Sequence, residues 1–256
     1  MIFIQWSSVT LPQPNGEFEW VQASWGPALR CPAIQTPHVF TSRSLELRSN
    51  HEAWRQLAAD LGVEPGSIFH PKQVHGDAVF VVPSGAAERG EGACGVADII
   101  MTSNTDSAVA VQAADCVPLL FFDPATGAVA AAHAGWRGTA AGVARSTTRA
   151  MADRFGSRAD DLIVAIGPSI GPCCYRVGEE LLGAFGAEGR RWFYHLAGGW
   201  MLNLWNANRD QLVEAGVNGE NVHLAELCTA MHPDVFDSYR RDGTVAGRLA
   251  AAIKAR

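Results

Sequence analysis

The sequence lacks the patterns that mark several large classes of protein. No stretch of about 18 apolar residues occurs, so neither a membrane-spanning helix nor a membrane partner is expected. The chain has 20 lysine and arginine residues against 26 aspartate and glutamate residues, a net charge of −6, and no basic stripe. We therefore expect no nucleic-acid partner. The first residues show no basic region ahead of an apolar stretch, which argues against a signal peptide and predicts a cytoplasmic protein.

Short metal-binding and redox motifs are also absent. None of the 6 cysteines belongs to a Cys-x-x-Cys pair, which excludes zinc ribbons, thioredoxin-type motifs and ordinary iron–sulfur runs. The 8 histidines form neither His-x-His nor His-Glu-x-x-His. Any metal site must therefore be assembled from distant segments. The scattered cysteines are expected to be thiols in a reducing cytosol rather than a disulfide framework.

What the sequence does contain is typical of a globular protein. Hydrophobic residues make up 48% of its 256 residues and charged residues 18%. Apolar strand patterns dominate the middle of the chain with helical patterns between them, and no repeat or linker divides it. We predict an α+β fold: a single domain over residues 1–256, with mixed β-sheets flanked by helices in a layered α/β sandwich. Residues 1–36, rich in proline and tryptophan, are expected to be an irregular N-terminal segment.

Local signals predict the main elements. Helices are predicted over residues 50–61, 139–155 and 202–213. The first has Asn50 as its N-cap and Gly62 as its stop. Strands are predicted over residues 79–82, 107–112, 116–122, 128–133, 162–166 and 222–227. A loop rich in glycine, alanine and glutamate is expected between the first of these strands and Gly95.

The turn at residues 123–127 predicts a hairpin of the two strands beside it. If Phe122 pairs with Gly127, Cys116 faces His133 directly on the same side of the sheet. A slip of one residue would place the two side chains on opposite faces. The expected pairing therefore brings a thiol and an imidazole together.

His75, Cys116 and His133 each stand at a strand end that opens into a loop bearing glycine. Two histidines and one cysteine are good zinc ligands, and they leave the fourth position open, as in catalytic zinc sites. The residues alone leave three interpretations open. These are a metal site, ordinary packed or hydrogen-bonded side chains, and a hydrolase dyad with Cys116 as nucleophile and His133 as base.

Six segments occur in an order that carries a resemblance to a known family. They are Gln73–Gly76, Ala97-Asp98, Ala114–Pro118, His133–Gly138, Ile166–Tyr175 and Ser238–Gly243. From about Phe40 to the C-terminus, the chain resembles the laccase-domain family. That family is long described as polyphenol oxidases and is also called purine nucleoside phosphorylases or peptidoglycan editing factors. The resemblance implies that His75, Cys116 and His133 bind an active-site metal, usually zinc. It also implies purine nucleoside and phosphate as substrates.

Further residues are candidates for catalysis and substrate binding. Arg137 precedes the helix predicted from Thr139, so its guanidinium and the helix N-terminus could together hold phosphate. Asp115, beside the cysteine, is a candidate for orienting a ligand or for acid–base catalysis, with an Asx turn or backbone cap as the alternative. The remaining candidates for contacts with phosphate or nucleoside are Arg43, Gln73, Arg240 and Arg241. The adjacent cysteines, Cys173 and Cys174, make an awkward pair of metal ligands and are expected to be structural.

One segment departs from the family pattern. Thr41-Ser-Arg43 runs directly into Ser44–Leu47, whereas family members usually have a glycine-rich loop at this point. Glu46 also stands where an asparagine is usual. A wall of the substrate pocket is therefore expected to differ on this side.

Four functions fit these residues. The first, which we predict, is a zinc-dependent purine nucleoside enzyme that phosphorolyses adenosine, inosine and methylthioadenosine and deaminates adenosine. The second is a copper-dependent polyphenol oxidase, because thiolate and imidazole also accept copper. A single mononuclear site, however, cannot reduce oxygen by four electrons in the laccase manner. The third is a hydrolase of peptidoglycan precursors, using zinc-activated water or the Cys116–His133 dyad. The fourth is a non-enzymatic module that binds purines or metal.

Overall fold

The computed structural model describes residues 10–48, 50–83, 93–196 and 198–256. Its largest sheet has seven strands in the order β1-β2-β3-β16-β8-β4-β6. Their bounds are Glu19–Ala23 (β1), Gly26–Arg30 (β2), His38–Thr41 (β3), Leu249–Lys254 (β16), Ala108–Ala113 (β8), Ile68–Lys72 (β4) and Ala93–Val96 (β6). The second sheet has six strands in the order β15-β11-β9-β10-β7-β5. Their bounds are Val222–Leu224 (β15), Ile163–Ile166 (β11), Val117–Phe122 (β9), Val129–Ala134 (β10), Ile99–Thr102 (β7) and Val79–Val81 (β5).

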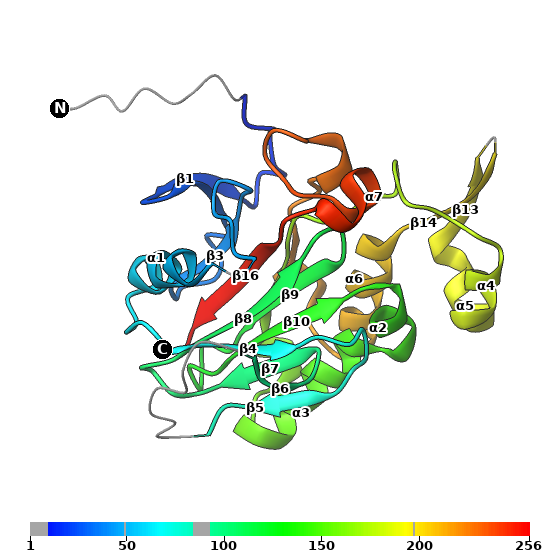
Figure 1. The fold of residues 1–256 in the computed structure, drawn as a ribbon. Coiled ribbons are helices and arrows are strands. Elements are labelled where there is room, and N and C mark those ends of the chain that lie inside the picture. Colours follow the sequence, from blue (N-terminus) through cyan, green and yellow to red (C-terminus); the bar gives the residue numbers. More distant parts are fainter. Residues whose placement is uncertain (1–9, 49, 84–92, 197) are drawn as a thin grey trace.

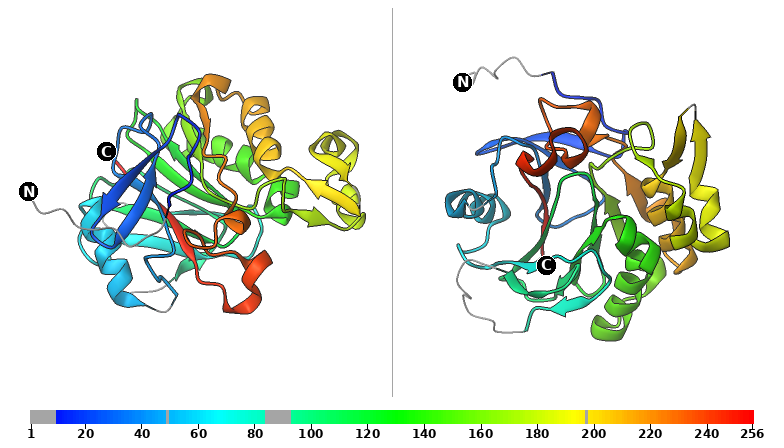
Figure 2. Two further views of the ribbon diagram at one scale, coloured as in Figure 1. Left: turned by 90° about the horizontal axis from the view of Figure 1, so that it is seen from above. Right: turned by 45° about the vertical axis from the view of Figure 1, so that its right-hand side comes forward.

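A small third sheet and the α-helices complete the fold. The third sheet has the order β12-β14-β13. Its strands are Arg176–Val177 (β12), Gly199–Leu202 (β14) and Phe193–Leu196 (β13). The α-helices are His51–Leu61 (α1), Trp136–Ala141 (α2), Val143–Phe155 (α3), Glu180–Ala184 (α4), Gly186–Gly189 (α5), Leu204–Glu214 (α6) and Tyr239–Asp242 (α7). The third sheet projects from one side of the molecule together with α4 and α5 (Figure 2).

The two large sheets face each other across a hydrophobic core, and helices cover their outer faces (Figure 1). Strand β9 illustrates the arrangement, because all of its residues are buried. Leu120 and Phe122 point into the core between the sheets, whereas Leu119 and Phe121 point into the core on the side of α3 and α6. A strand buried on both faces requires a continuous apolar run. The predicted layered α+β sandwich is therefore confirmed.

No helix of the described residues is long and apolar enough to cross a membrane. The longest is α3, with 13 residues.

The first predicted helix is confirmed together with both of its caps. The side chain of Asn50 accepts a hydrogen bond from the amide of Ala53 at the start of α1. Gly62 ends the helix with a φ of 66°, in the left-handed region that glycine enters without steric cost.

The prediction of one helix from Thr139 to Phe155 is wrong, because the chain forms two helices there. Helix α2 begins at Trp136, before the predicted start, and is interrupted at Gly142. This glycine has a φ of 89°, so it ends α2 and turns the chain into α3. The amide of Thr139 donates to the carbonyl of Gly135, so it is not available to an anion. The helix N-terminus expected after Arg137 therefore lies at Trp136, three residues before the predicted start.

The predicted hairpin forms, but its register differs by two residues. Phe122 pairs with Val129 rather than with Gly127, and His133 pairs with Pro118. The loop is longer because Asp123 accepts bonds from the amides of Ala125 and Thr126 and closes it into a wider turn. A shift of two residues preserves the faces of the sheet. Cys116 therefore stays on the same face as His133, in a diagonal rather than a direct relation.

Three further expectations need correction. The segment 1–36 is not irregular where it is described, because β1 and β2 form an antiparallel hairpin within it. The strand predicted over 222–227 ends at Leu224. Of the loop expected before Gly95, residues 84–92 lie outside the described residues, and β6 occupies the end.

Candidate metal centre and active site

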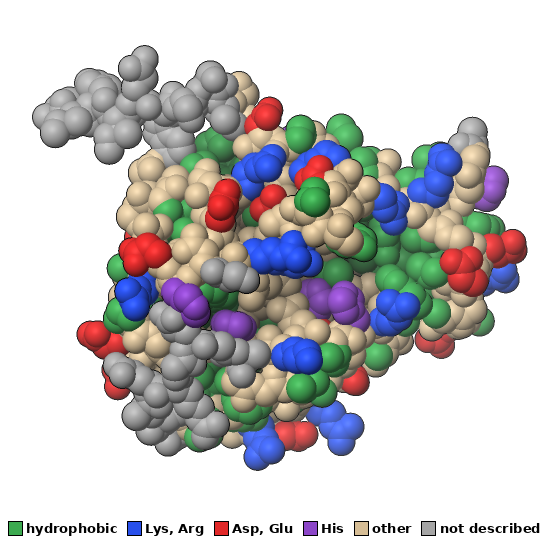
Figure 3. Space-filling model, in the orientation of Figure 1, with side chains coloured by type: hydrophobic (Ala, Val, Ile, Leu, Met, Phe, Trp, Pro, Cys, Tyr) green, Lys and Arg blue, Asp and Glu red, His purple; other side chains and the backbone are tan. Residues whose placement is uncertain are grey.

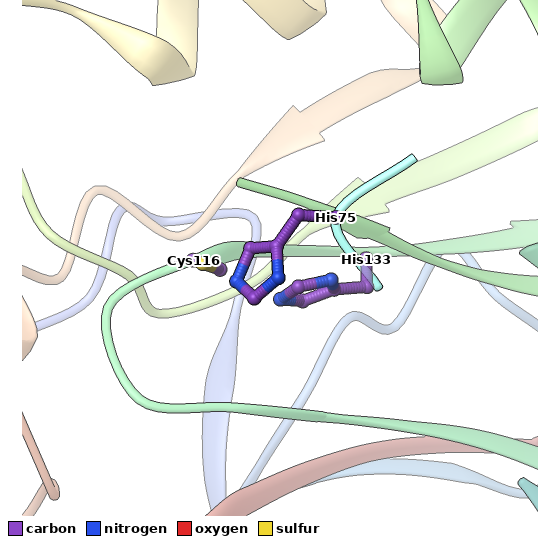
Figure 4. Close-up of side chains that lie close together, drawn as sticks. All are labelled: His75, Cys116 and His133. Carbon is purple, nitrogen blue, oxygen red and sulfur yellow. The ribbon is translucent and has the colours of Figure 1, made fainter. Parts of the chain in front are cut away.

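The three predicted ligands converge at one place. One ring nitrogen each of His75 and His133 and the sulfur of Cys116 all lie within 4.8 Å of one another. The two imidazole rings are 4.9 Å apart at their centroids and meet edge to face. Figure 4 shows the two rings side by side with Cys116 next to them. His133 is buried, Cys116 is half-buried and His75 is exposed, so the cluster opens to solvent on the side of His75.

Gly135 has no side chain, and the space this leaves lets the Cys116 sulfur lie close to the two imidazole rings. Because His133 pairs with Pro118 in the ladder, extending the register by two residues places Cys116 opposite Gly135. A Cβ on Gly135 would lie 2.9 Å from the sulfur of Cys116 and 3.0 Å from Cδ2 of His75. Such contacts are far shorter than van der Waals distances, so any larger residue would push the Cys116 or His75 side chain out of this arrangement. The only sequence signal for Gly135 was its place in the segment His133–Gly138, which the chain shares with the laccase-domain family.

Replacing Gly135 by alanine is expected to weaken zinc binding with little effect on folding. The added methyl group must push the Cys116 or His75 side chain aside, at a cost of about 1–3 kcal/mol, or roughly 10–100-fold in affinity. The measurement is a zinc titration against a chromophoric chelator. Gly183→Ala serves as the control, because nothing lies within 4 Å of the Cβ that it would add. Equal zinc affinity in the two variants would show that Gly135 does not shape the site.

Asp98 joins the loop of residues 74–76, which carries His75, to His133. The sequence predicted no role for Asp98. Its buried carboxylate accepts a hydrogen bond from Nδ1 of His133 at 2.8 Å. It also accepts from the backbone amides of Val74 at 3.1 Å, His75 at 2.9 Å and Gly76 at 2.7 Å. With Nδ1 committed to Asp98, the free nitrogen of His133 is Nε2. The carboxylate thus fixes one ligand directly and positions the backbone of the other.

The same contacts explain the backbone of His75. Its φ of 65° lies in the left-handed region, which is rare for a residue with a side chain. Its amide and those on either side all point at the Asp98 carboxylate. This anion compensates the strain and keeps the imidazole directed at Cys116. The only sequence signal for Asp98 was its presence in one of the motifs shared with the laccase-domain family.

The electrostatics of the cluster favour a thiolate beside an imidazolium when no metal is bound. Burial raises the pKa of Cys116, but the neighbouring His133 and His75 outweigh it and lower the pKa to about 6. Burial lowers the pKa of His133, but the charges of Cys116 and Asp98 outweigh it and raise the pKa to about 9. Burial also opposes ionisation of Asp98, yet the bonds from His133 and the backbone amides lower its pKa. A metal cation would replace the proton of His133 as the partner of the thiolate.

Replacing Asp98 by asparagine is expected to weaken both the fold and zinc binding. An amide has one acceptor oxygen, so some of the four donors would face its NH₂ group, at a cost of about 1–3 kcal/mol in the free energy of unfolding. Zinc affinity should fall by about 10–100-fold, as expected when the partner of a ligand histidine is lost. Chemical denaturation and chelator competition measure the two effects.

Asp123→Asn is the matched control, because Asp123 is also fully buried and accepts backbone amide bonds, but in the β9–β10 turn. It should lower stability without changing zinc affinity. A zinc affinity that falls equally in both variants would mean that Asp98 acts only through general stability.

The cluster lies in a cavity of about 820 Å³. Four cationic side chains line it, together with one carboxylate, Asp115. The cations are Lys72, Arg137, Arg240 and Arg248. The aromatic side chains on its wall are Trp136, Tyr175 and Tyr239. Figure 3 shows histidine side chains in a hollow of this face, with lysine and arginine side chains around it. The cavity therefore favours an anionic ligand with a flat ring.

The arginines predicted to bind phosphate occupy different positions. Arg137 lines the cavity, and its guanidinium carbon lies 4.3 Å from the ring centroid of Trp136. Within the described part of the chain, this guanidinium makes no hydrogen bond or ion pair. Arg240 also lines the cavity, but its Nη1 donates to the carbonyls of Cys174 and Arg176. Arg137 is thus better placed to bind a ligand.

Arg43 and Arg241 do not line this cavity. Arg43 donates to the carbonyl of Pro233 and lies 3.9 Å from Asp237. Arg241 pairs with Asp242 and donates to two backbone carbonyls. Glu46, in the segment that departs from the family pattern, is exposed and is not part of the cavity wall. Lys72 and Arg248, by contrast, reach the cavity although no sequence signal singled them out.

Gln73 and Asp115 line the cavity, but their polar atoms are engaged with protein groups. The amide nitrogen of Gln73 donates to the carbonyl of Gln112 at 2.7 Å, and its oxygen accepts from the amide of that residue at 2.8 Å. Asp115 accepts from the hydroxyl of Thr229 and from the backbone amide of Arg240. These contacts favour a positioning role for both residues. For Asp115 they support the backbone-capping alternative over proton transfer.

Comparisons with known proteins agree with this geometry. Residues 46–256 match the profile of a family described as multi-copper polyphenol oxidoreductase laccase. A purine nucleoside phosphorylase of Deinococcus radiodurans is 35% identical over 245 residues, which are 89% of this chain and 92% of the relative. An adenosine deaminase, RL5, from an unknown prokaryotic organism is 32% identical over 210 residues, 77% of this chain and 78% of the relative.

The fold is similar to solved structures as well. The crystal structure of YlmD from Geobacillus stearothermophilus superposes with a TM-score of 0.83 at 31% identity, covering 93% of this chain and 98% of that one. The resemblance stated from the sequence motifs is thereby confirmed. The chain belongs to the family described as multi-copper polyphenol oxidoreductase laccase.

Proposed function

We propose that this protein is a zinc-dependent purine nucleoside enzyme that phosphorolyses adenosine, inosine and methylthioadenosine and deaminates adenosine. The observation that carries the proposal is the convergence of His75, Cys116 and His133 in a cavity with a cationic wall. Its volume of about 820 Å³ lies in the range of small-molecule sites, about 300–1,000 Å³. The names of the relatives, purine nucleoside phosphorylase and adenosine deaminase, support the substrate class.

The donor set fits zinc. Two imidazole nitrogens and one thiolate are preferred zinc ligands, and three protein ligands leave a position for water or substrate. When bound, zinc acts as a Lewis acid and lowers the pKa of a water molecule to about 7, which is the chemistry that deamination needs. Asp98 keeps Nδ1 of His133 occupied and so presents Nε2 to the site. The exposed side of His75 is the side from which a nucleoside would approach.

The cavity wall supplies the remaining groups. Trp136 is half-buried and offers a flat surface for a purine ring. Arg137, stacked beside it, offers a guanidinium fork for phosphate. In phosphorolysis a phosphate oxygen forms a bond to C1′ of the ribose as the bond between C1′ and the base breaks. Arg137 would hold the phosphate close to that carbon, with Lys72 and Arg248 adding positive charge around it.

One observation favours a second candidate, a hydrolase that uses Cys116 as its nucleophile. A thiol with a pKa of about 6 beside an imidazole with a pKa of about 9 forms the ion pair typical of thiol catalysts. Such a dyad needs Cys116 and His133 but not His75. Replacing His75 by alanine would therefore leave the dyad active and disable the zinc site. Copper is a second possible occupant of the same ligands, because thiolate and imidazole accept it.

The proposal is tested by identifying the products of adenosine with and without phosphate. Without phosphate we expect inosine alone, because deamination consumes water rather than phosphate. With phosphate we also expect adenine from adenosine, and hypoxanthine from the inosine that deamination forms. Elemental analysis of the same preparation identifies the metal. If zinc-loaded protein formed neither a phosphorolysis product nor a deamination product from adenosine, the proposal would be contradicted.

A further inference from the structure

A second cluster of ligand atoms lies outside the site described above. The sulfur atoms of Cys173, Cys174 and Cys228 all lie within 4.8 Å of one another. Those of Cys173 and Cys174 are 3.7 Å apart. Two sulfurs bound to one metal ion, each at about 2.3 Å, lie at most about 4.6 Å apart. The three thiols are therefore close to the spacing of a single coordination sphere. The expectation that Cys173 and Cys174 are structural considered only the adjacent pair, whereas the structure adds Cys228 as a third sulfur.

The backbone brings these two segments together and fixes them. Cys228 forms an isolated parallel bridge with Ser169, in the loop after β11. The amide of Ser169 donates to Leu227 at 3.1 Å, and the amide of Thr229 donates back to Ser169 at 3.0 Å. Gly171 allows the close approach, since a Cβ on it would lie 3.1 Å from the Cβ of Cys228. The third thiol is therefore held in place by backbone contacts on both sides.

The donors in this cluster are all sulfur. Cys228 is buried and its sulfur accepts a hydrogen bond from the amide of Gly171 at 3.2 Å, a contact that stabilises negative charge on sulfur. Cys174 is half-buried and Cys173 is exposed, so an ion can enter from solvent at Cys173.

We propose that Cys173, Cys174 and Cys228 form a second metal site, which binds the soft monovalent ion Cu(I). Thiolates select Cu(I), zinc or iron–sulfur clusters over hard cations. Zinc in a closed structural site takes four protein ligands, whereas the cluster offers three among the described residues. Cu(I) accepts three sulfur ligands and is among the ions that thiolates select. This site is independent of the proposed nucleoside chemistry.

The test is an anaerobic Cu(I) titration of reduced protein in competition with a chromophoric Cu(I) chelator. The parent for this experiment carries Cys116→Ser and His75→Ala, so that the first site no longer binds metal. We expect the parent to bind one equivalent of Cu(I) and the additional Cys228→Ser variant to bind none. Cys94→Ser, at a half-buried cysteine outside the cluster, is the control and should retain the equivalent.

A second cluster variant separates loss of a ligand from a folding defect, and a zinc competition tests selectivity. Cys173→Ser changes an exposed side chain and should also abolish Cu(I) binding, so a folding defect of the buried Cys228 variant does not decide the outcome. Circular dichroism should be the same for the Cys173→Ser variant and the parent. Retention of the Cu(I) equivalent in both cluster variants would overturn the proposal. So would displacement of Cu(I) from the parent by an equimolar amount of zinc, because the site would then not be selective for a soft monovalent ion.

Discussion

Replacing Cys116 by serine is expected to abolish nucleoside turnover while leaving the fold intact. Cys116 is half-buried just before β9, and the change removes no large side chain from the core. A serine hydroxyl is not ionised at neutral pH and is a poor zinc ligand. The loss of metal catalysis is worth several kcal/mol, or about 10³-fold or more in rate. Steady-state rates with adenosine, zinc content and the melting temperature measure the effect.

Cys94→Ser is the control for the loss of a thiol. Its sulfur donates to the carbonyl of His70 and a hydroxyl can keep that bond, so activity and zinc content should stay near the parent values. His75→Ala separates the two mechanisms. Under the zinc mechanism it loses both metal and activity, whereas a Cys116–His133 dyad would keep working. Full activity of the Cys116→Ser variant would contradict both the zinc mechanism and the Cys116–His133 dyad.

Replacing Arg137 by alanine is expected to cripple phosphorolysis far more than deamination. Its guanidinium lines the cavity and is stacked on Trp136, without a hydrogen bond to the described protein groups. A charged hydrogen bond to phosphate contributes about 1.5–3 kcal/mol, so the KM for phosphate should rise by roughly 10–150-fold. Deamination consumes water and should change by only a few-fold. Both rates and the melting temperature are measured on the same preparation.

The alternative is that Arg137 only supports its loop. Both activities would then fall together with the melting temperature, and that pattern would discard the phosphate role. Arg149→Ala is the matched control, because Arg149 is an exposed arginine on α3 that pairs with Asp153 and lies outside the cavity. It should leave both activities unchanged.

The sequence predicted those parts of the fold that short-range signals determine. The caps of α1 at Asn50 and Gly62 depend on contacts within a few residues, and both were predicted correctly. The apolar runs of β9 and β10 predicted a buried hairpin because both faces of each strand are covered. The convergence of His75, Cys116 and His133 was also expected, but only the family resemblance favoured it over the alternatives.

Longer-range features escaped prediction because they depend on partners distant in the chain. The hairpin register depends on how Asp123 closes its turn, and propensity does not distinguish loops that differ by two residues. The role of Asp98 depends on a loop 22 to 24 residues earlier. The cysteine cluster likewise joins Cys173 and Cys174 to Cys228, which lies far along the chain. Gly142 interrupts a helical pattern whose flanking residues are compatible with one continuous helix.

The most direct test of the central claim is the rate of adenosine turnover as metal-stripped protein is titrated with zinc. The account predicts no turnover in the stripped protein, recovery as zinc is added, and no recovery in the Cys116→Ser variant. Full turnover by stripped protein, with zinc and copper below detection, would contradict the assignment of His75, Cys116 and His133 as the metal site of this enzyme.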